Sequence, residues 1–293
     1  MSEITERTNI ISIAEMPAHD IHSSMLELDK MSSYQPLKIV LSKLASYIPA
    51  DVTSPIQSIT GSLSGASNET SIKSPNSLRT TFKEAFTPTL SKLEAKGINP
   101  VVARKATIIS TLNKMDFKIK KDDSINSSLM AVFQAKDMKT LNTEIKTVMH
   151  KLEVSHTEVF AHNIANACAI ASHNVGFREV VIKTIQGKLE VIAGNNLGQR
   201  ILSEISLDSK INQVNANTET IGITNSSCTW IITQFNEELR KMNIKIGEEK
   251  NTFTGGVCKM SYAKIIDQQD KESKKQKELE RTRKLNSNKQ IKN

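Results

Sequence analysis

Cysteine, aromatic residues and long apolar runs are all scarce in this sequence. Only 4% of its 293 residues are aromatic, 38% are hydrophobic, and three are cysteine. Cysteines that are few, odd in number and not at metal-ligand spacing favour free thiols in a reducing compartment over a disulfide framework. No stretch approaches the roughly 20 apolar residues that cross a bilayer, and the N-terminus lacks the apolar segment of a secretory signal. We therefore expect a cytoplasmic protein with no membrane segment.

The low apolar content also indicates that part of the chain is linker or tail rather than core. The distribution of charge supports the same division. Residues 264–293 hold ten basic and five acidic side chains, so they carry five of the eight net positive charges of the chain. The basic character therefore belongs mainly to a charged C-terminal tail, which we place at residues 261–293.

The first 77 residues carry one clear amphipathic pattern. Apolar residues recur at helical spacing between Leu37 and Leu44, and Pro49 is expected to stop that helix. Residues 1–50 are thus predicted to be an N-terminal arm with a short helix. Residues 51–77 are rich in Ser, Thr, Gly, Asn and Pro, a composition that predicts a flexible linker.

Residues 78–175 are predicted to form a helical region that begins with a helical hairpin. Ser77 is a suitable N-cap for its first helix, and Pro88 predicts a kink or break within it. Gly97 suits the left-handed cap at the end of this helix. Asn99, followed by a proline, suits the start of the next helix, expected to run to about residue 115.

Three more helices are predicted before residue 175. Two are expected at about residues 125–135 and 138–153. Ser155-His-Thr-Glu158 then has the form of a capping box, in which the serine and glutamate side chains bond to each other's backbone amides. This motif predicts that a third helix begins at Ser155 and runs to about His173.

At Gly176 the spacing of apolar residues changes from about 3.6 to about 2. From there to residue 221, short alternating stretches separated by Gly, Asn and Asp turns predict an antiparallel four-stranded meander. A helix at about residues 226–242, with Trp230 on its apolar stripe, is expected to cover one face of the sheet. The fold class is therefore predicted as α+β, with a helical N-terminal half and an antiparallel module at residues 176–260.

Neither the histidines nor the cysteines form a catalytic or metal-binding set in the sequence. His162 and His173 lie eleven residues apart, which is about 16 Å along a helix and too far to share a metal ion. Cys168 lies about 240° around the helix from His162, so the two cannot act as nucleophile and base. Cys228, at a predicted helix start, could have a lowered thiol pKa, but the sequence offers no base for it, and packing in the core is the favoured interpretation. We expect no metal, no cofactor and no catalytic residue.

The tail supplies the other candidate interaction residues besides Cys228. Its basic side chains could neutralise nucleic-acid phosphates, order on a protein partner, or merely increase solubility. Five acidic residues among them, and the absence of aromatic residues after Tyr262, argue against base stacking. The candidate residues are Lys274, Lys275, Lys277, Arg281, Arg283 and Lys284.

Residues 166–260 also carry short motifs in a recognisable order. These are Gly176-Phe177, a strand pair about Gly187, Thr218-Glu219-Thr220-x-Gly222 after Val214, and Ser226-Ser227-Cys228 at a helix start. The segment resembles a small uncharacterised family of plastid and bacterial proteins encoded beside AAA+ ATPase genes. In that family a strand ends in Glu-x-x-Gly and a Ser-Cys pair opens the next helix. The resemblance implies an accessory protein in an ATPase-centred gene cluster.

The absence of a catalytic set, the linker and the charged tail together favour a non-enzymatic adaptor. Its partner is expected to be a protein, and the resemblance implies an AAA+ ATPase. The alternative is a nucleic-acid-associated protein that acts through the basic tail, and a third hypothesis is an enzyme that uses Cys228.

Overall fold

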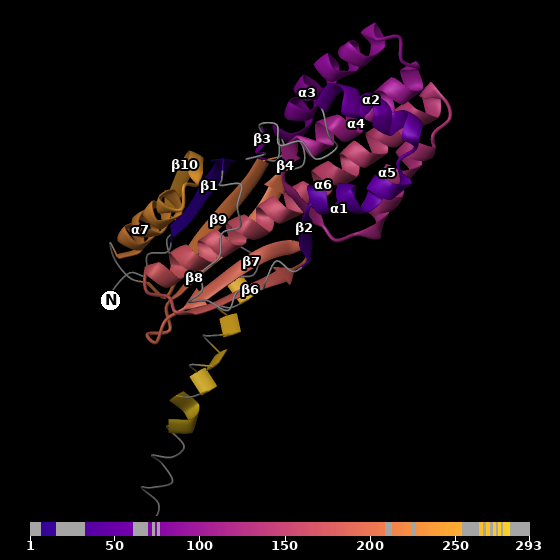
Figure 1. Ribbon diagram of the computed structural model, residues 1–293. Helices are drawn as coiled ribbons and strands as arrows, with labels where there is room; N and C mark the ends of the chain where they lie inside the picture. Colours follow the sequence, from indigo (N-terminus) through magenta and orange to yellow (C-terminus); the bar gives the residue numbers. More distant parts are fainter. Residues whose placement is uncertain are drawn as a thin grey trace, which may run out of the picture.

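The computed structural model describes residues 7–15, 33–60, 70–71, 74, 77–208, 213–223 and 227–253, with scattered positions between 264 and 281. Within these residues, a helical region and a sheet share one long helix (Figure 1). The helical region contains α1 (Leu37–Leu44), α2 (Ala50–Thr60), α3 (Ser77–Ala95), α4 (Pro100–Asn113) and α5 (Asp123–Gln134). Its short strands are β2 (Tyr34–Pro36), β3 (Thr70–Ser71), β4 (Met115–Asp116) and β5 (Lys118–Lys120).

The sheet is antiparallel throughout and has six strands in the order β10-β1-β9-β8-β7-β6. Two helices pack against it, α6 (Met138–Asn174) and α7 (Ser227–Lys241). The strands are β1 (Arg7–Glu15), β6 (Glu179–Ile185), β7 (Lys188–Gly194), β8 (Arg200–Asp208), β9 (Gln213–Ile221) and β10 (Lys245–Phe253).

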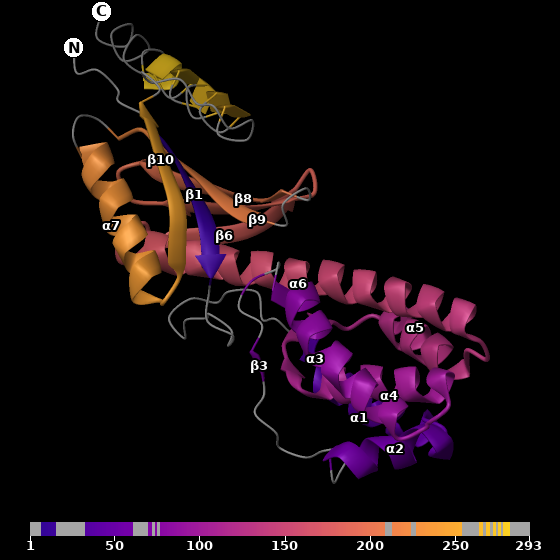
Figure 2. The ribbon, with the colours of Figure 1, turned by 90° about the horizontal axis from the view of Figure 1, so that it is seen from above.

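Helix α6 joins the two parts of the molecule. It has 37 residues, so it is about 55 Å long, and Figure 2 shows it running from the helical region to the far side of the sheet. In its first half, Leu141 and Leu152 belong to the buried cluster of the helical region. In its second half, Phe160 and Ile164 belong to the cluster that covers the sheet. One helix therefore contributes to both hydrophobic cores.

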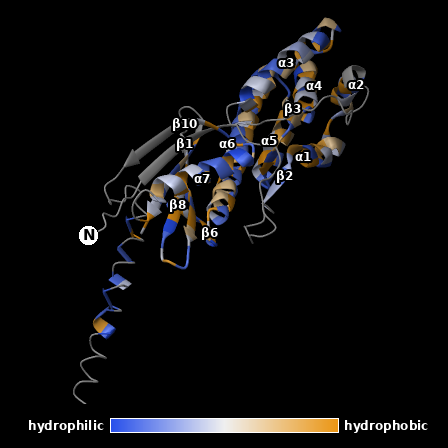
Figure 3. Cartoon of the chain, turned by 90° about the vertical axis from the view of Figure 1, so that its left-hand side faces the viewer, coloured by the Kyte–Doolittle hydropathy of each residue, from blue (hydrophilic) through white to orange (hydrophobic). Residues whose placement is uncertain are grey.

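The helical hairpin of α3 and α4 follows the predicted signals at its turn. Gly97 has φ +71°, in the left-handed region that glycine tolerates best. The side chain of Asn99 accepts hydrogen bonds from the amides of Val101 and Val102 and caps α4. Figure 3 shows apolar and polar positions alternating along these helices. These local predictions are confirmed.

The break predicted at Pro88 is wrong, because α3 runs without interruption from Ser77 to Ala95. Proline cannot donate its backbone bond within a helix. Two threonine hydroxyls on either side donate to backbone carbonyls of the preceding turn, Thr87 to Lys83 and Thr89 to Ala85.

The linker predicted for residues 51–77 is wrong over its first part. Residues 50–60 form α2, whose Val52 and Ile56 are buried in the helical core. Two apolar side chains at i and i+4 are enough to hold this helix against α4, although polar residues dominate its composition. The remainder of the linker prediction falls largely outside the described residues.

The capping box does not begin a helix, because α6 is continuous through Ser155. The Ser155 hydroxyl instead accepts a hydrogen bond from the backbone amide of Lys120, the last residue of β5. The two helices predicted at 138–153 and from Ser155 are thus one. A donor from a distant part of the chain takes the place of the local amide that a cap would bind.

The predicted four-stranded meander is confirmed as β6, β7, β8 and β9, with continuous antiparallel register. The complete sheet is larger than predicted, however. Strand β1, within the region expected to be an arm, pairs with β9 on one side and β10 on the other. The N-terminal half is therefore not purely helical, since its first described segment belongs to the sheet.

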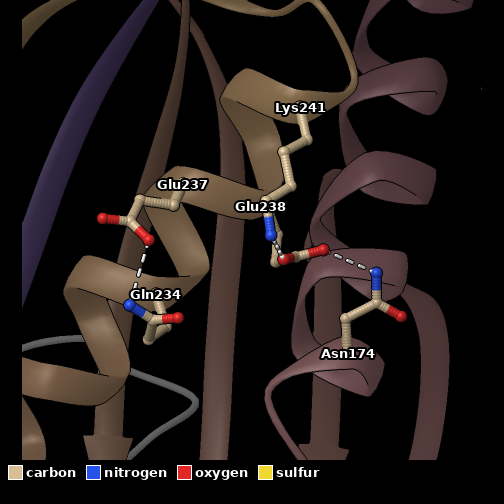
Figure 4. A network of polar contacts seen from close by, with 5 residues as sticks. All are labelled: Asn174, Gln234, Glu237, Glu238 and Lys241. Carbon is tan, nitrogen blue, oxygen red and sulfur yellow. Dashed lines mark hydrogen bonds and ion pairs between the residues drawn. The ribbon is translucent and has the colours of Figure 1, made fainter.

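The second half of α6 and the whole of α7 cover the same face of the sheet. Their C-terminal ends are joined by Glu238, which accepts from Asn174 at 2.7 Å and pairs with Lys241 (Figure 4). The helix predicted at 226–242 is thus confirmed as a cover. The prediction for Trp230 is wrong, because its side chain is 60% exposed while Ile231 and Phe235 are buried.

Candidate functional site

A cleft of about 680 Å³ lies where the helical region meets the sheet. A smaller hollow of about 210 Å³ adjoins it and shares Lys120, His150, Val154 and Glu158 with it. From α6 the cleft is lined by His150, Glu153, Val154, Thr157, Glu158, Ala161 and His162, and from other elements by Tyr34, Lys120, Thr184, Gly187, Lys188, Leu189, Ile205 and Ser206.

The α6 residues of the cleft form one stripe along the helix. Positions 150, 154, 158 and 161 recur at intervals of four, four and three residues, which places them on one face. In the middle of this stripe Val154 is 47% exposed, whereas the opposite side of the same helix packs into the cores. The cleft therefore presents an apolar side chain between polar ones.

Most charged groups of the cleft already have a partner of opposite charge. The ammonium of Lys120 lies 3.4 Å from the Glu158 carboxylate. On the sheet side, Lys188 lies 3.0 Å from Glu204. At the edge of the cleft, Glu153 accepts from Arg79 at 2.7 Å. The cleft therefore carries charges of both signs, arranged in pairs along its walls.

Two aromatic contacts fix the walls nearest to β2 and β5. The ring of Tyr34 lies 5.5 Å from that of His162, at an interplanar angle of 58°. Beneath the cleft, the buried ring of His156 stands edge-on to Phe117 with centroids 5.3 Å apart. Burial lowers the pKa of His156 to about 4, although the backbone carbonyls of two neighbouring residues oppose the shift. His156 is therefore a neutral packing residue at physiological pH.

Both described thiols are buried in the sheet core and do not reach the cleft. Cys228 is fully buried, and its sulfur lies 2.7 Å from the Thr220 hydroxyl. Burial raises the pKa of Cys168 to about 12, and a hydrogen bond with Ser203 opposes the shift only in part. Cys228 is thus buried rather than presented at the surface, and its role as an interaction residue stays a prediction.

The basic tail is described at only some of its positions. Lys275 and Arg281 lie on helical turns and are exposed. The other predicted interaction residues of the tail, Lys274, Lys277, Arg283 and Lys284, lie outside the described residues. A role of the tail in binding a protein or a nucleic acid therefore stays a prediction.

Three glutamates lie on the sheet face opposite α6 and α7. Glu190 pairs with Glu204 in the register of β7 and β8, and Glu219 follows on β9. Burial, together with the charges of Glu204 and Glu219, raises the pKa of Glu190 to about 7, although Lys188 opposes the shift. Within the part of the chain that the structure describes, no three His, Cys, Asp or Glu residues are arranged to hold a metal ion.

From the sequence, His162 was weighed only against His173 and Cys168, and the cleft was not predicted. The stripe at positions 150, 154, 158 and 161 was not recognised, because two separate helices were predicted at 138–153 and from Ser155, whereas α6 is continuous. The opposite wall was not visible. Tyr34, Lys120 and Lys188 come from three distant segments, and only the folded topology brings them together.

None of the helices in the described ranges is both long enough and apolar enough to cross a membrane. No protein-family model matches the chain, and no curated protein or solved structure gives a significant match to it.

Proposed function

We propose that this chain is a non-catalytic adaptor that binds a partner protein in the cleft beside α6. The observation that carries the proposal is the exposed Val154 at the centre of that cleft, surrounded by polar side chains. Protein interfaces commonly have this arrangement, with an apolar centre that excludes water and a polar rim that fixes the orientation of the partner.

The electrostatics of the cleft support binding over catalysis. A general base or a nucleophile needs an unsatisfied group whose proton affinity suits its task. Here Lys120 and Lys188 are each neutralised by a glutamate, and the two described thiols are buried elsewhere. Such charges serve better as a rim that recognises complementary groups on a partner.

The position of the cleft gives it a further advantage as an interface. Its walls come from both the helical region and the sheet, and α6 packs in the cores of both. A surface carried by helices and strands keeps its shape better than one carried by loops. The partner class that the resemblance of residues 166–260 implies is an AAA+ ATPase, and this part of the proposal depends on the resemblance alone.

The proposal can be tested with a photo-activated cross-linking amino acid at position 154 in the native cells. We expect a discrete protein adduct of defined mass, because Val154 would lie at the centre of the interface. Position 39 is the matched control, since Ile39 is a similarly exposed aliphatic residue, 44% exposed, but on α1 and outside the cleft lining. Adducts that are absent, or the same at both positions, would contradict the proposal.

Deleting residues 264–293 from the same cross-linking chain distinguishes the adaptor from the alternative, a nucleic-acid-associated protein. If the cleft binds the partner, the adduct at position 154 persists after the deletion. If the tail carries the function, the adduct disappears together with retention on nucleic acid at low salt.

A further inference from the structure

Strand β6 forms one outer edge of the sheet, and its outer side has no partner among the described elements. A free edge exposes a row of unpaired backbone donors and acceptors, which proteins usually protect with proline, a bulge or a covering segment. Residues 179–185 contain no proline, and they pair with β7 without a register shift. Among the elements that the structure describes, the edge is therefore regular and has no neighbouring strand.

The β6–β7 hairpin determines which backbone groups face outward. Its turn consists of Gln186 and Gly187, both with positive φ, 51° and 80°, as in a type I′ turn. In such a hairpin the flanking residues, Ile185 and Lys188, form a hydrogen-bonded pair, and hydrogen-bonded and non-hydrogen-bonded pairs then alternate along the strands. The N–H and C=O groups of even-numbered residues in β6, such as Ile182, therefore point to the open edge.

The side chains of β6 divide between the two faces of the sheet. Val180 and Ile182 pack against the core beneath α6. Glu179, Val181 and Lys183 lie on the opposite face and are exposed, Val181 to 47%. The exposed face of β6 thus carries an acidic residue, a valine and a basic residue at alternate positions.

We propose that β6 binds the β6 strand of a second copy of this chain, antiparallel and with Val181 opposite Val181 on a two-fold axis. In this register Glu179 of each copy lies directly opposite Lys183 of the other. Val180 lies opposite Ile182, and these are the residues whose backbone groups point outward. The two six-stranded sheets become one continuous sheet, and the interface is self-complementary, as a two-fold axis requires.

The charges select this register over its neighbours. A shift by one residue would place core-facing side chains on the opposite face. Centring the pair on Ile182 instead would set Glu179 opposite Ile185 and Val181 opposite Lys183, which leaves both charges without a direct partner. Only the register centred on Val181 forms two ion pairs and buries the exposed valine between them.

The dimer does not depend on the proposed adaptor function, and it is tested by light scattering and sedimentation of the purified full chain over a concentration series. We expect a reversible dimer that Val181→Lys abolishes, because it places two ammonium groups on the axis. Glu179→Lys and Lys183→Glu each turn two attractive pairs into repulsive ones and should weaken dimerisation about tenfold.

The double reversal, Glu179→Lys with Lys183→Glu, restores opposite charges across the interface and should recover the dimer. Lys146→Glu, at an exposed position on α6, is the matched control and should have no effect. Circular dichroism confirms that each variant is folded. A chain that stays monomeric, or a dimer equally affected by the double reversal and the single ones, would overturn the proposal.

Discussion

At the scale of single residues, the buried imidazole of His156 makes the stability of the fold depend on pH. Its ordinary pKa of 6.5 is lowered to about 4 in the folded chain. Between these values the unfolded chain binds a proton that the folded chain excludes. Stability is therefore present above pH 6.5 and is lost progressively as the pH falls toward 4.

Replacing His156 by leucine should remove this dependence. Lowering the pH from about 7.5 to about 5 should reduce the free energy of unfolding of the unmodified chain through His156 by about 2 kcal/mol, a loss that His156→Leu should not show. Urea unfolding at both pH values measures the difference. His150→Leu changes an exposed histidine of the same helix and should keep the loss. An equal loss in His156→Leu would show that another group is responsible.

Helix α7 shows, at the same scale, how precisely a hydrophobic pattern locates the buried residues of a helix. The stripe on α7 was predicted with Trp230, but the buried side is formed by Cys228, Ile231, Ile232 and Phe235. Neighbouring helical positions differ by about 100°, so an error of one position moves a side chain from the core to solvent. Periodicity finds the apolar arc, and only the neighbouring sheet decides where its centre lies.

At the scale of elements, α6 shows a tertiary contact overriding a local signal. Ser155 and Glu158 have the spacing of a capping box, yet the helix continues through both. The amide that bonds to Ser155 belongs to Lys120, 35 residues earlier in the chain. Such a partner cannot be inferred from the motif, whereas the Asn99 cap could be predicted because both of its partners are local.

Removing the Ser155 hydroxyl should leave the Lys120 amide without its acceptor. Ser155→Ala should lower the free energy of unfolding by about 1–3 kcal/mol and accelerate hydrogen exchange at the Lys120 amide. NMR-detected exchange measures this directly, and Ser155→Thr should restore protection. Ser127→Ala is the control, since the exposed Ser127 hydroxyl bonds only within α5. Unchanged exchange at Lys120 would refute the role of the hydroxyl.

At the scale of the whole molecule, the shared helix couples the two hydrophobic cores. Leu152 is buried in the helical region and Phe160 against the sheet, eight residues apart on α6. If part of α6 unfolds, both cores lose side chains. The helical region and the sheet should therefore unfold together, although their cores are separate clusters.

A truncation in one core should consequently be detected in the other. Phe160→Ala should destabilise the chain by about 3–5 kcal/mol and increase hydrogen exchange in α4, which packs only in the helical region. Leu152→Ala should likewise increase exchange in β8. Trp230→Ala, at an exposed site, serves as the control. Two separate unfolding transitions, or unchanged exchange in α4, would show that the cores are independent.

The arrangement of the whole molecule was the feature hardest to predict from the sequence. The meander could be predicted because each strand pairs with the next, joined by short turns. The place of β1 could not, because its partners β9 and β10 are more than 200 residues away in the chain, and no local pattern specifies such a pairing. The cleft was missed for the same reason, since its walls come from distant segments.

The position of β1 also sets an order of events during synthesis of the chain. The ribosome makes this strand first, yet both of its neighbours are made near the end. Strands β6 to β9 can pair as they leave the ribosome, because each strand pairs with the one that follows it in the chain. The earliest strand must remain without a backbone partner until Gln213–Ile221 has been translated, so a stalled or shortened nascent chain carries an unpaired strand that other chains can capture.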